Sequence, residues 1–221
     1  MTDLTLSTAS TIASPRRPPG GAFIAAAVLG PLLLVLSALL NHTPASQSAA
    51  DVLVAVADHR GSQLAEVLLE MTGFVLTFTA CISAAIRLQG RGRGSRVAVA
   101  GWVGCLAGLI GFTLVGAEGL VLNALAGMAE HDAAVRAVDA TNHSPAVFIA
   151  LPLILIGELG IVAVLAAHRR AGLLPVWPLI AAVLALVVDF AGSSRAMLAV
   201  SDLLGLIAVW WLAAATVRRT T

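Results

Sequence analysis

The chain is poor in charged residues and contains neither lysine nor tyrosine. Only 11% of its 221 residues are charged, whereas an average soluble domain has about 25%. The net charge is +1, which argues against a nucleic-acid-binding surface. All thirteen basic residues are arginines, and alanine, valine, leucine and glycine are abundant. This usage is typical of a GC-rich genome, so the missing lysine has no functional meaning.

Cysteine and short catalytic motifs are also scarce. The two cysteines, Cys81 and Cys105, each fall inside an apolar run, and there is no CxxC pair. We therefore expect two small buried apolar side chains rather than a disulfide framework. The sequence has no phosphate-binding loop with its lysine, no GxSxG and no HExxH, and these absences argue against soluble cofactor chemistry. We expect no cofactor.

Apolar residues make up 59% of the chain, and the mean hydropathy is +0.95. A soluble core of this size needs far less apolar surface, so the solvent is lipid. A polar tail over residues 1–20 is expected to be disordered and cytosolic. Six apolar stretches follow, each near the roughly 20 residues that cross a bilayer. We place them at about 22–40, 64–86, 97–122, 146–167, 173–192 and 197–216. The sequence thus predicts an all-α, six-helix transmembrane bundle forming one domain over residues 21–217.

The arginines predict the orientation of this bundle. Ten of them lie on one side: Arg16, Arg17, Arg87, Arg91, Arg93, Arg96, Arg169, Arg170, Arg218 and Arg219. The other side has only Arg60, Arg136 and Arg195. The positive-inside rule then places both termini in the cytoplasm of a bacterial plasma membrane. A cleaved signal peptide is the alternative for the first span, but its long apolar run and Pro31 argue against it.

The two larger outer loops each contain an amphipathic stretch. In "SAADVLVAVAD" and "MAEHDAAVRAVDA" the apolar residues fall near one helical face. We expect a short interfacial helix in each loop. The alternative is a lid over a cavity that opens outward.

A five-residue word occurs twice at the outer surface, as "NHTPA" and "NHSPA". In the second copy Ser144 is a natural N-cap and Pro145 a natural first helical residue. Thr43 and Pro44 can begin a helix in the same way. Asn41 can end the first span in a left-handed conformation. The repeat therefore indicates two helix starts, and a true internal duplication is the alternative.

Four of the five histidines lie on the predicted outer side: His42, His59, His131 and His143. Acidic residues accompany them in "ADHRG" and "MAEHDAAVRAVD". Imidazole and carboxylate are ligands that Zn²⁺ and other divalent metals accept. No HxxxH or HExxH spacing supports such a site. The four histidines are therefore weak candidates for an outer metal site, and His42 and His143 are also candidate binding or pH-responsive groups.

Glycines form a stripe on the third span: Gly101, Gly104, Gly108 and Gly111. Stripes of small residues let membrane helices approach closely. We expect the stripe to pack against another helix of the same bundle, and a dimer interface is the alternative.

Carboxyl groups occur in spans two to six, where a charge costs at least about 2.5–3.5 kcal/mol on insertion scales. They are Glu66, Glu70, Glu118, Glu158, Asp189 and Asp202. If these side chains face inward, they line a polar cavity that opens outward, and crowding in a low dielectric keeps some of them protonated. The candidates for acid/base or proton-coupling chemistry are Glu70, Glu118, Glu158 and Asp202. The candidate binding residues are Glu66, Asn123, Asp189 and Arg195. Partly hydrated interfacial acids and an Asp189–Arg195 salt bridge are the alternative.

The layout resembles a family of uncharacterised six-helix membrane proteins of actinobacteria, labelled as a domain of unknown function. The similar features are "AADVLVAVAD" before the second span, the glycine-rich third span and "GELGIVAVLAAHRRAGLLPVWPLI" in the fourth and fifth spans. The turn "RRAGLLP" is the most similar stretch. The resemblance implies a six-helix fold and brings no catalytic residues.

Three classes of function fit these features. The first is binding or transport of a hydrophobic or cationic small molecule through an acidic intramembrane cavity, with a homodimer completing the pathway. The second is a membrane-embedded enzyme in which paired carboxylates such as Glu70 and Glu118 act on a lipid or isoprenoid, as in small membrane cyclases. The third is an accessory or immunity-type membrane protein whose acids shape a partner interface.

Overall fold

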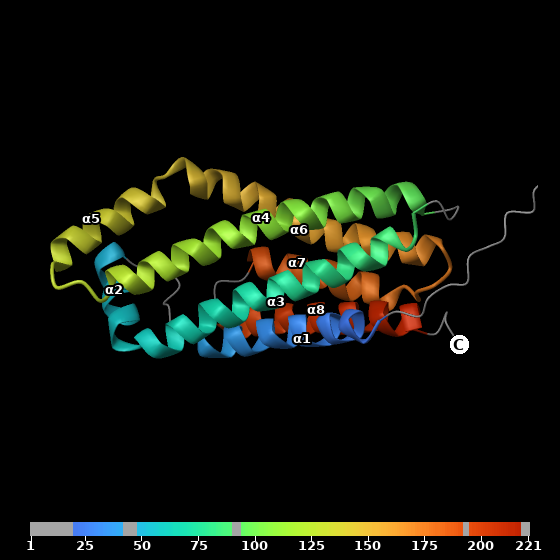
Figure 1. The fold of residues 1–221 in the computed structure, drawn as a ribbon, viewed down its shortest axis with the longest axis horizontal. Helices are drawn as coiled ribbons and strands as arrows, with labels where there is room; N and C mark the ends of the chain where they lie inside the picture. The colour runs from blue at the N-terminus through green and yellow to red at the C-terminus, as the bar shows by residue number, and fades with distance from the viewer. Residues whose placement is uncertain (1–19, 42–47, 90–93, 192–194, 218–221) are drawn as a thin grey trace, which may run out of the picture.

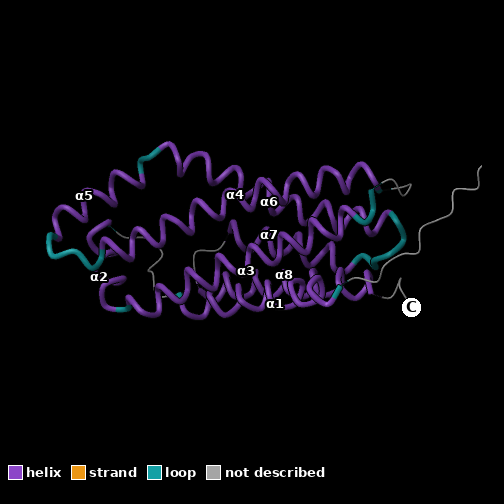
Figure 2. Tube along the Cα trace, in the orientation of Figure 1, coloured by secondary structure: helices purple, strands orange, loops and turns teal. Residues whose placement is uncertain are grey.

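A computed structural model describes residues 20–41, 48–89, 94–191 and 195–217. These residues form eight helices, and none of them forms a strand (Figures 1 and 2). The helices are α1 (Gly21–Leu40), α2 (Ala49–Asp58), α3 (Arg60–Ile86), α4 (Ser95–Leu125), α5 (His131–Asn142), α6 (Pro145–Arg170), α7 (Trp177–Ala191) and α8 (Arg195–Val217). Apart from Gly20, the predicted disordered tail lies outside the described residues.

Five of these helices are long and apolar enough to cross a membrane: α1, α3, α4, α6 and α8. Their outward faces expose many large apolar side chains, including Leu39, Phe148 and Trp210, which only a lipid environment tolerates in such number. The protein is therefore an all-helical membrane protein. The predicted stretch 173–192 forms only the shorter apolar helix α7, which has 15 residues and a length of about 22 Å.

The long helices lie side by side, and α2 and α5 lie together at one end, here called the α2/α5 end (Figure 1). Around the bundle, α6 packs on α4, α4 on α3, α3 on α1, α1 on α8, and α8 on α7. The ring closes only loosely, because α7 makes most of its contacts with α8 and few with α6. In Figure 1 the α7–α8 hairpin stops short of the α2/α5 end, whereas α3 and α4 continue to it.

The two short helices predicted in the larger loops are present as α2 and α5. They pack against each other and against the end of α4 through a small apolar cluster that includes Leu53, Ala134 and Val138. This cluster is separate from the main core, which lies between the long helices. Whether α2 and α5 lie in the membrane interface stays a prediction.

Glycines allow a very close contact between α4 and α6. A Cβ atom on Gly104 would lie 2.9 Å from the Cα atom of Gly160. Further along the same contact, a Cβ atom on Gly108 or Gly157 would collide with the backbone of the other. The predicted glycine stripe therefore packs inside the chain, and these glycines are buried against α6 rather than presented at a dimer interface.

The helix starts at the repeated word are partly as predicted. Pro145 is the first residue of α6 and Ser144 is its N-cap, but the Ser144 side chain makes no capping hydrogen bond. The left-handed conformation predicted for Asn41 is wrong, because its backbone is extended, with φ −60° and ψ 118°. Thr43 and Pro44 lie outside the described residues. The cap of α2 is Ser48, whose hydroxyl accepts a hydrogen bond from the Asp51 amide at 3.3 Å.

Candidate functional site

A cavity of about 450 Å³ lies within the bundle. Its walls come from α1, α3, α6, α7 and α8, and Phe112 contributes from α4. It is lined by the second half of α1, the first half of α3 and the end of α7. Because these segments all lie toward the α2/α5 end, the cavity occupies that half of the bundle.

Each wall is one face of a helix. The lining residues of α6 are Leu151, Ile154, Glu158, Ile161 and Val162, which repeat at intervals of three and four residues. This is the spacing of one helical face. The glycines of α6 lie on a different side of the helix and face α4. The glycine contact therefore turns Glu158 away from α4 and into the cavity.

Five of the six intramembrane acids line this cavity: Glu66, Glu70, Glu158, Asp189 and Asp202. They come from four helices, α3, α6, α7 and α8. Glu66 is buried, with 8% of its surface exposed, and the other four are half-buried. The structure thus brings together carboxyl groups that are up to 136 positions apart in the sequence, from 66 to 202.

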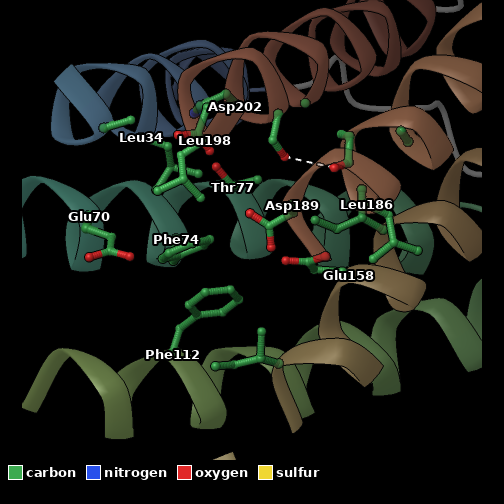
Figure 3. A pocket seen from close by; sticks show the side chains of 18 of the residues that line it. Leu34, Glu70, Phe74, Thr77, Phe112, Glu158, Leu186, Asp189, Leu198 and Asp202 are labelled. Atoms are coloured by element: carbon green, nitrogen blue, oxygen red, sulfur yellow. Dashed lines mark hydrogen bonds between the residues drawn. The ribbon is translucent and has the colours of Figure 1, made fainter. Parts of the chain in front are cut away.

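Two of these carboxyl groups form a pair. Figure 3 shows the carboxyl groups of Glu158 and Asp189 turned toward each other in the cavity wall. A hydrogen bond between two carboxyl groups needs a proton on one of them, because an ionised carboxylate only accepts. Two carboxyl groups arranged in this way can therefore share one proton within the membrane-spanning part of the bundle.

The position of Asp202 depends on the serine before it. The Ser201 hydroxyl donates a hydrogen bond to the Ala185 carbonyl at 2.9 Å, drawn as the dashed line in Figure 3. This bond joins α8 to α7 across the hairpin. With Ser201 held on α7, the next residue presents its carboxyl group to the cavity, on the side opposite Glu158 in Figure 3.

Three lining residues on α3 and α4 were not among the sequence candidates. The rings of Phe74 and Phe112 stack with centroids 3.4 Å apart and form an aromatic wall. Thr77 is only 4% exposed, and its hydroxyl has no hydrogen-bond partner among the described residues. Helical spacing could have found both α3 residues, because 66, 70, 74 and 77 follow one face.

The remaining intramembrane acid, Glu118, lies on α4 and does not line the cavity. The pair proposed from the sequence for acid/base chemistry, Glu70 and Glu118, therefore does not share it. The side chain of Arg195 and all of His42 lie outside the described residues.

Asn123 also lies away from the cavity and joins two helices. Its amide nitrogen donates to the Arg60 carbonyl at 2.9 Å and to Gln63 Oε1 at 2.7 Å. Gln63 in turn donates to the Gly119 carbonyl at 3.3 Å. This network fixes the start of α3 against the end of α4.

We expect Asn123→Ala to lower stability by about 1–3 kcal/mol, because it leaves the Gln63 amide oxygen buried without its partner. The cavity should be unaffected. Thermal unfolding of the detergent-solubilised variant measures the loss of stability. Ligand binding, measured well below the unfolding temperature, checks that the cavity is unchanged. A loss of ligand binding without a loss of stability would return Asn123 to the list of binding residues.

The histidines do not assemble into a metal site in the described part of the chain. His59, His131 and His143 are exposed and lie at helix ends or junctions. The Nδ1 atom of His143 lies 2.8 Å from the Asp139 carbonyl oxygen, a bond within its own segment. No group of three His, Cys, Asp or Glu side chains there could hold a metal ion.

The chain matches no protein-family model, no curated protein and no solved structure. The resemblance to the six-helix actinobacterial family therefore stays a prediction.

Proposed function

We propose that this protein binds an organic cation in the cavity and moves it across a bacterial plasma membrane in exchange for protons. The observation that supports this most strongly is the convergence of five carboxyl groups on one cavity within the apolar helices. Charges in this position are costly. Among the described residues no lysine or arginine side chain lines the cavity to offset them. A bound cation offsets that cost.

The Glu158–Asp189 pair gives a means of coupling to protons. When a singly charged cation binds beside the pair, the shared proton leaves and both carboxylates face the cation. One proton is released for each cation bound, so charge in the cavity is unchanged. Since proton and cation compete for the same oxygens, cation affinity should rise with pH and fall in acid.

The orientation proposed from the arginines places the α2/α5 end outside the cell and both termini in the cytoplasm. In this arrangement all six apolar helices cross the membrane, with the short α7 reaching across with the residues before Trp177. The cavity then lies in the outer half of the membrane.

Binding of tetraphenylphosphonium, a bulky organic cation, tests the proposal. Protein in lipid nanodiscs is dialysed against the radiolabelled cation, with empty nanodiscs as the blank. We expect saturable binding that strengthens as the pH rises from acid to alkaline, and about one proton released per cation in a weakly buffered solution. Binding that is absent, or that is indifferent to pH, contradicts the exchange mechanism.

Transport itself is measured in proteoliposomes with an imposed pH gradient. Uptake of the cation should follow outward proton movement and stop when the gradient is collapsed. Protein-free liposomes give the background of passive permeation, which is substantial for lipophilic cations.

A second candidate is a membrane-embedded enzyme, which the Glu158–Asp189 pair favours. One protonated and one ionised carboxyl group facing an apolar cavity can act as general acid and general base. Incubation with a labelled prenyl alcohol, followed by mass spectrometry of the extracted lipids, would reveal a product. The accessory-protein class predicts instead that amide substitutions of the cavity acids leave the protein's cellular role intact.

A further inference from the structure

Two residues of the cavity wall reach the surface of the bundle. Among the described lining residues of the cavity only two are exposed, Leu151 on α6 and Phe190 on α7, with exposed fractions of 56% and 57%. All the others are buried or half-buried. Leu151 and Phe190 belong to α6 and α7, the neighbouring helices that pack most loosely, so a mouth of the cavity is assigned to the gap between these two helices.

The surroundings of this mouth are apolar. Leu151 lies six residues into an apolar helix, and the exposed side chains near it on α6 include Phe148 and Leu155. On α7, Val187 is exposed beside Phe190. A mouth framed in this way opens sideways into the hydrocarbon of the membrane rather than into water.

The acids lie directly behind this apolar rim. Asp189 precedes Phe190 in α7, and Glu158 lies on the same face of α6 as Leu151, seven residues further on. A molecule that passes between Leu151 and Phe190 therefore meets the Glu158–Asp189 pair. This order, apolar rim first and carboxyl pair behind, suits a molecule with an apolar body and a cationic group.

The interior matches the same chemistry. The stacked rings of Phe74 and Phe112 offer a flat apolar surface on which a cation can also rest. The Thr77 hydroxyl, buried and without a partner among the described residues, lines the cavity and can bond to a ligand. A volume of about 450 Å³ is within the range of small-molecule sites.

We infer that the ligand is a lipophilic amine or quaternary ammonium compound that enters from the lipid between α6 and α7, past Leu151 and Phe190. The inference rests on the proposed function for the occupant's charge, and on the proposed orientation for the side of the membrane. It adds the chemical class of the ligand and its route.

The first test compares two probes with the same cationic group. Dodecyltrimethylammonium partitions into the bilayer, whereas tetramethylammonium stays in water. With protein in nanodiscs, we expect the long-chain probe to bind at least about tenfold more tightly after correction for empty nanodiscs, because its tail fills the apolar part of the cavity. Equal affinities would overturn the assigned ligand class. Displacement of bound dodecyltrimethylammonium by neutral dodecanol would also overturn the assigned ligand class.

The second test blocks the mouth. Leu151→Cys and Phe190→Cys are each labelled with a bulky maleimide, and association of dodecyltrimethylammonium is followed by stopped flow. The matched controls are Ile149→Cys and Leu184→Cys, which lie on the same two helices, are 56% and 48% exposed and do not line the cavity. The unsubstituted protein controls for reaction at Cys81 and Cys105, both of which are buried.

We expect labelling at the two mouth positions to slow association by more than about tenfold and labelling at the control positions to leave it unchanged. Equal rates at all four positions would overturn the lateral route. If the labels have no effect but Glu158→Gln still abolishes binding, the route is wrong and the proposed function stands. If unmodified protein binds neither this probe nor tetraphenylphosphonium, the proposed function fails and the inference fails with it.

Discussion

Replacing Glu158 with glutamine should weaken tetraphenylphosphonium binding by roughly 30-fold or more. Removing one partner of a desolvated charge pair costs about 2 kcal/mol or more, and 1.4 kcal/mol is a factor of ten. Glu158 is the best choice among the acids because its carboxyl group faces that of Asp189 and lines the same cavity as Asp202. Glutamine keeps the size and a hydrogen-bonding side chain, so the loss reports on charge. Equilibrium dialysis in nanodiscs measures it.

The matched control is Glu118→Gln, the same chemical change at a half-buried position outside the cavity. We expect its cation affinity to stay within about twofold of the unsubstituted protein, since distant sites are independent. The pH dependence of cation binding distinguishes the two variants further. It should be retained in Glu118→Gln and flattened in Glu158→Gln, because the shared proton is lost with the carboxyl group. Equal losses in both variants would show that neither acts through the cavity.

The sequence was sufficient to predict the helices and which of them contain acids. Apolar length alone predicted α1, α3, α4, α6 and α8 to within a few residues of their ends. An apolar run of about 20 residues predicts a helix, because in lipid every backbone group must be hydrogen-bonded within its own segment. Glu158 was predicted as a site residue for the same reason, because a carboxyl group in mid-helix is costly.

The sequence was not sufficient to separate the acids that share the cavity from the one that does not. Glu118 and Glu66 look alike in the sequence, each near the end of an apolar run. Their faces differ only once the neighbours of α3 and α4 are known. Neutral side chains of the site, such as Thr77 and Phe112, carry no charge whose burial would be costly, so nothing in the sequence marks them as site residues. They become visible only after one residue on their face has been placed in the cavity.

Backbone conformation at helix ends was the least predictable feature. Asn41 was expected to be left-handed, but it ends α1 in an extended conformation. An asparagine tolerates the left-handed region without requiring it, so residue type alone does not decide. Ser144 shows the same limit, since it occupies the N-cap position without using its hydroxyl as a cap.

The glycine contact between α4 and α6 connects these observations, because it determines where Glu158 points. Gly157 packs against Gly108, and the residue after it is rotated by about 100° around the helix axis. Any side chain at Gly157 forces α6 away from α4 and moves Glu158 relative to α7. Packing and ligand binding should therefore fail together when this contact is widened.

We expect Gly157→Ala to destabilise the protein by about 3 kcal/mol, the upper end of the usual cost of overpacking. The added methyl meets helix backbone, which cannot yield as a flexible side chain can. Denaturant unfolding in mixed micelles measures the loss. The control is Gly205→Ala in the middle of α8, where a Cβ atom meets nothing within 4 Å. There the better helix propensity of alanine should stabilise by roughly 0.5–1 kcal/mol. If both variants gain stability, α4 and α6 are not in contact at these glycines, and the placement of Glu158 that depends on this contact is wrong.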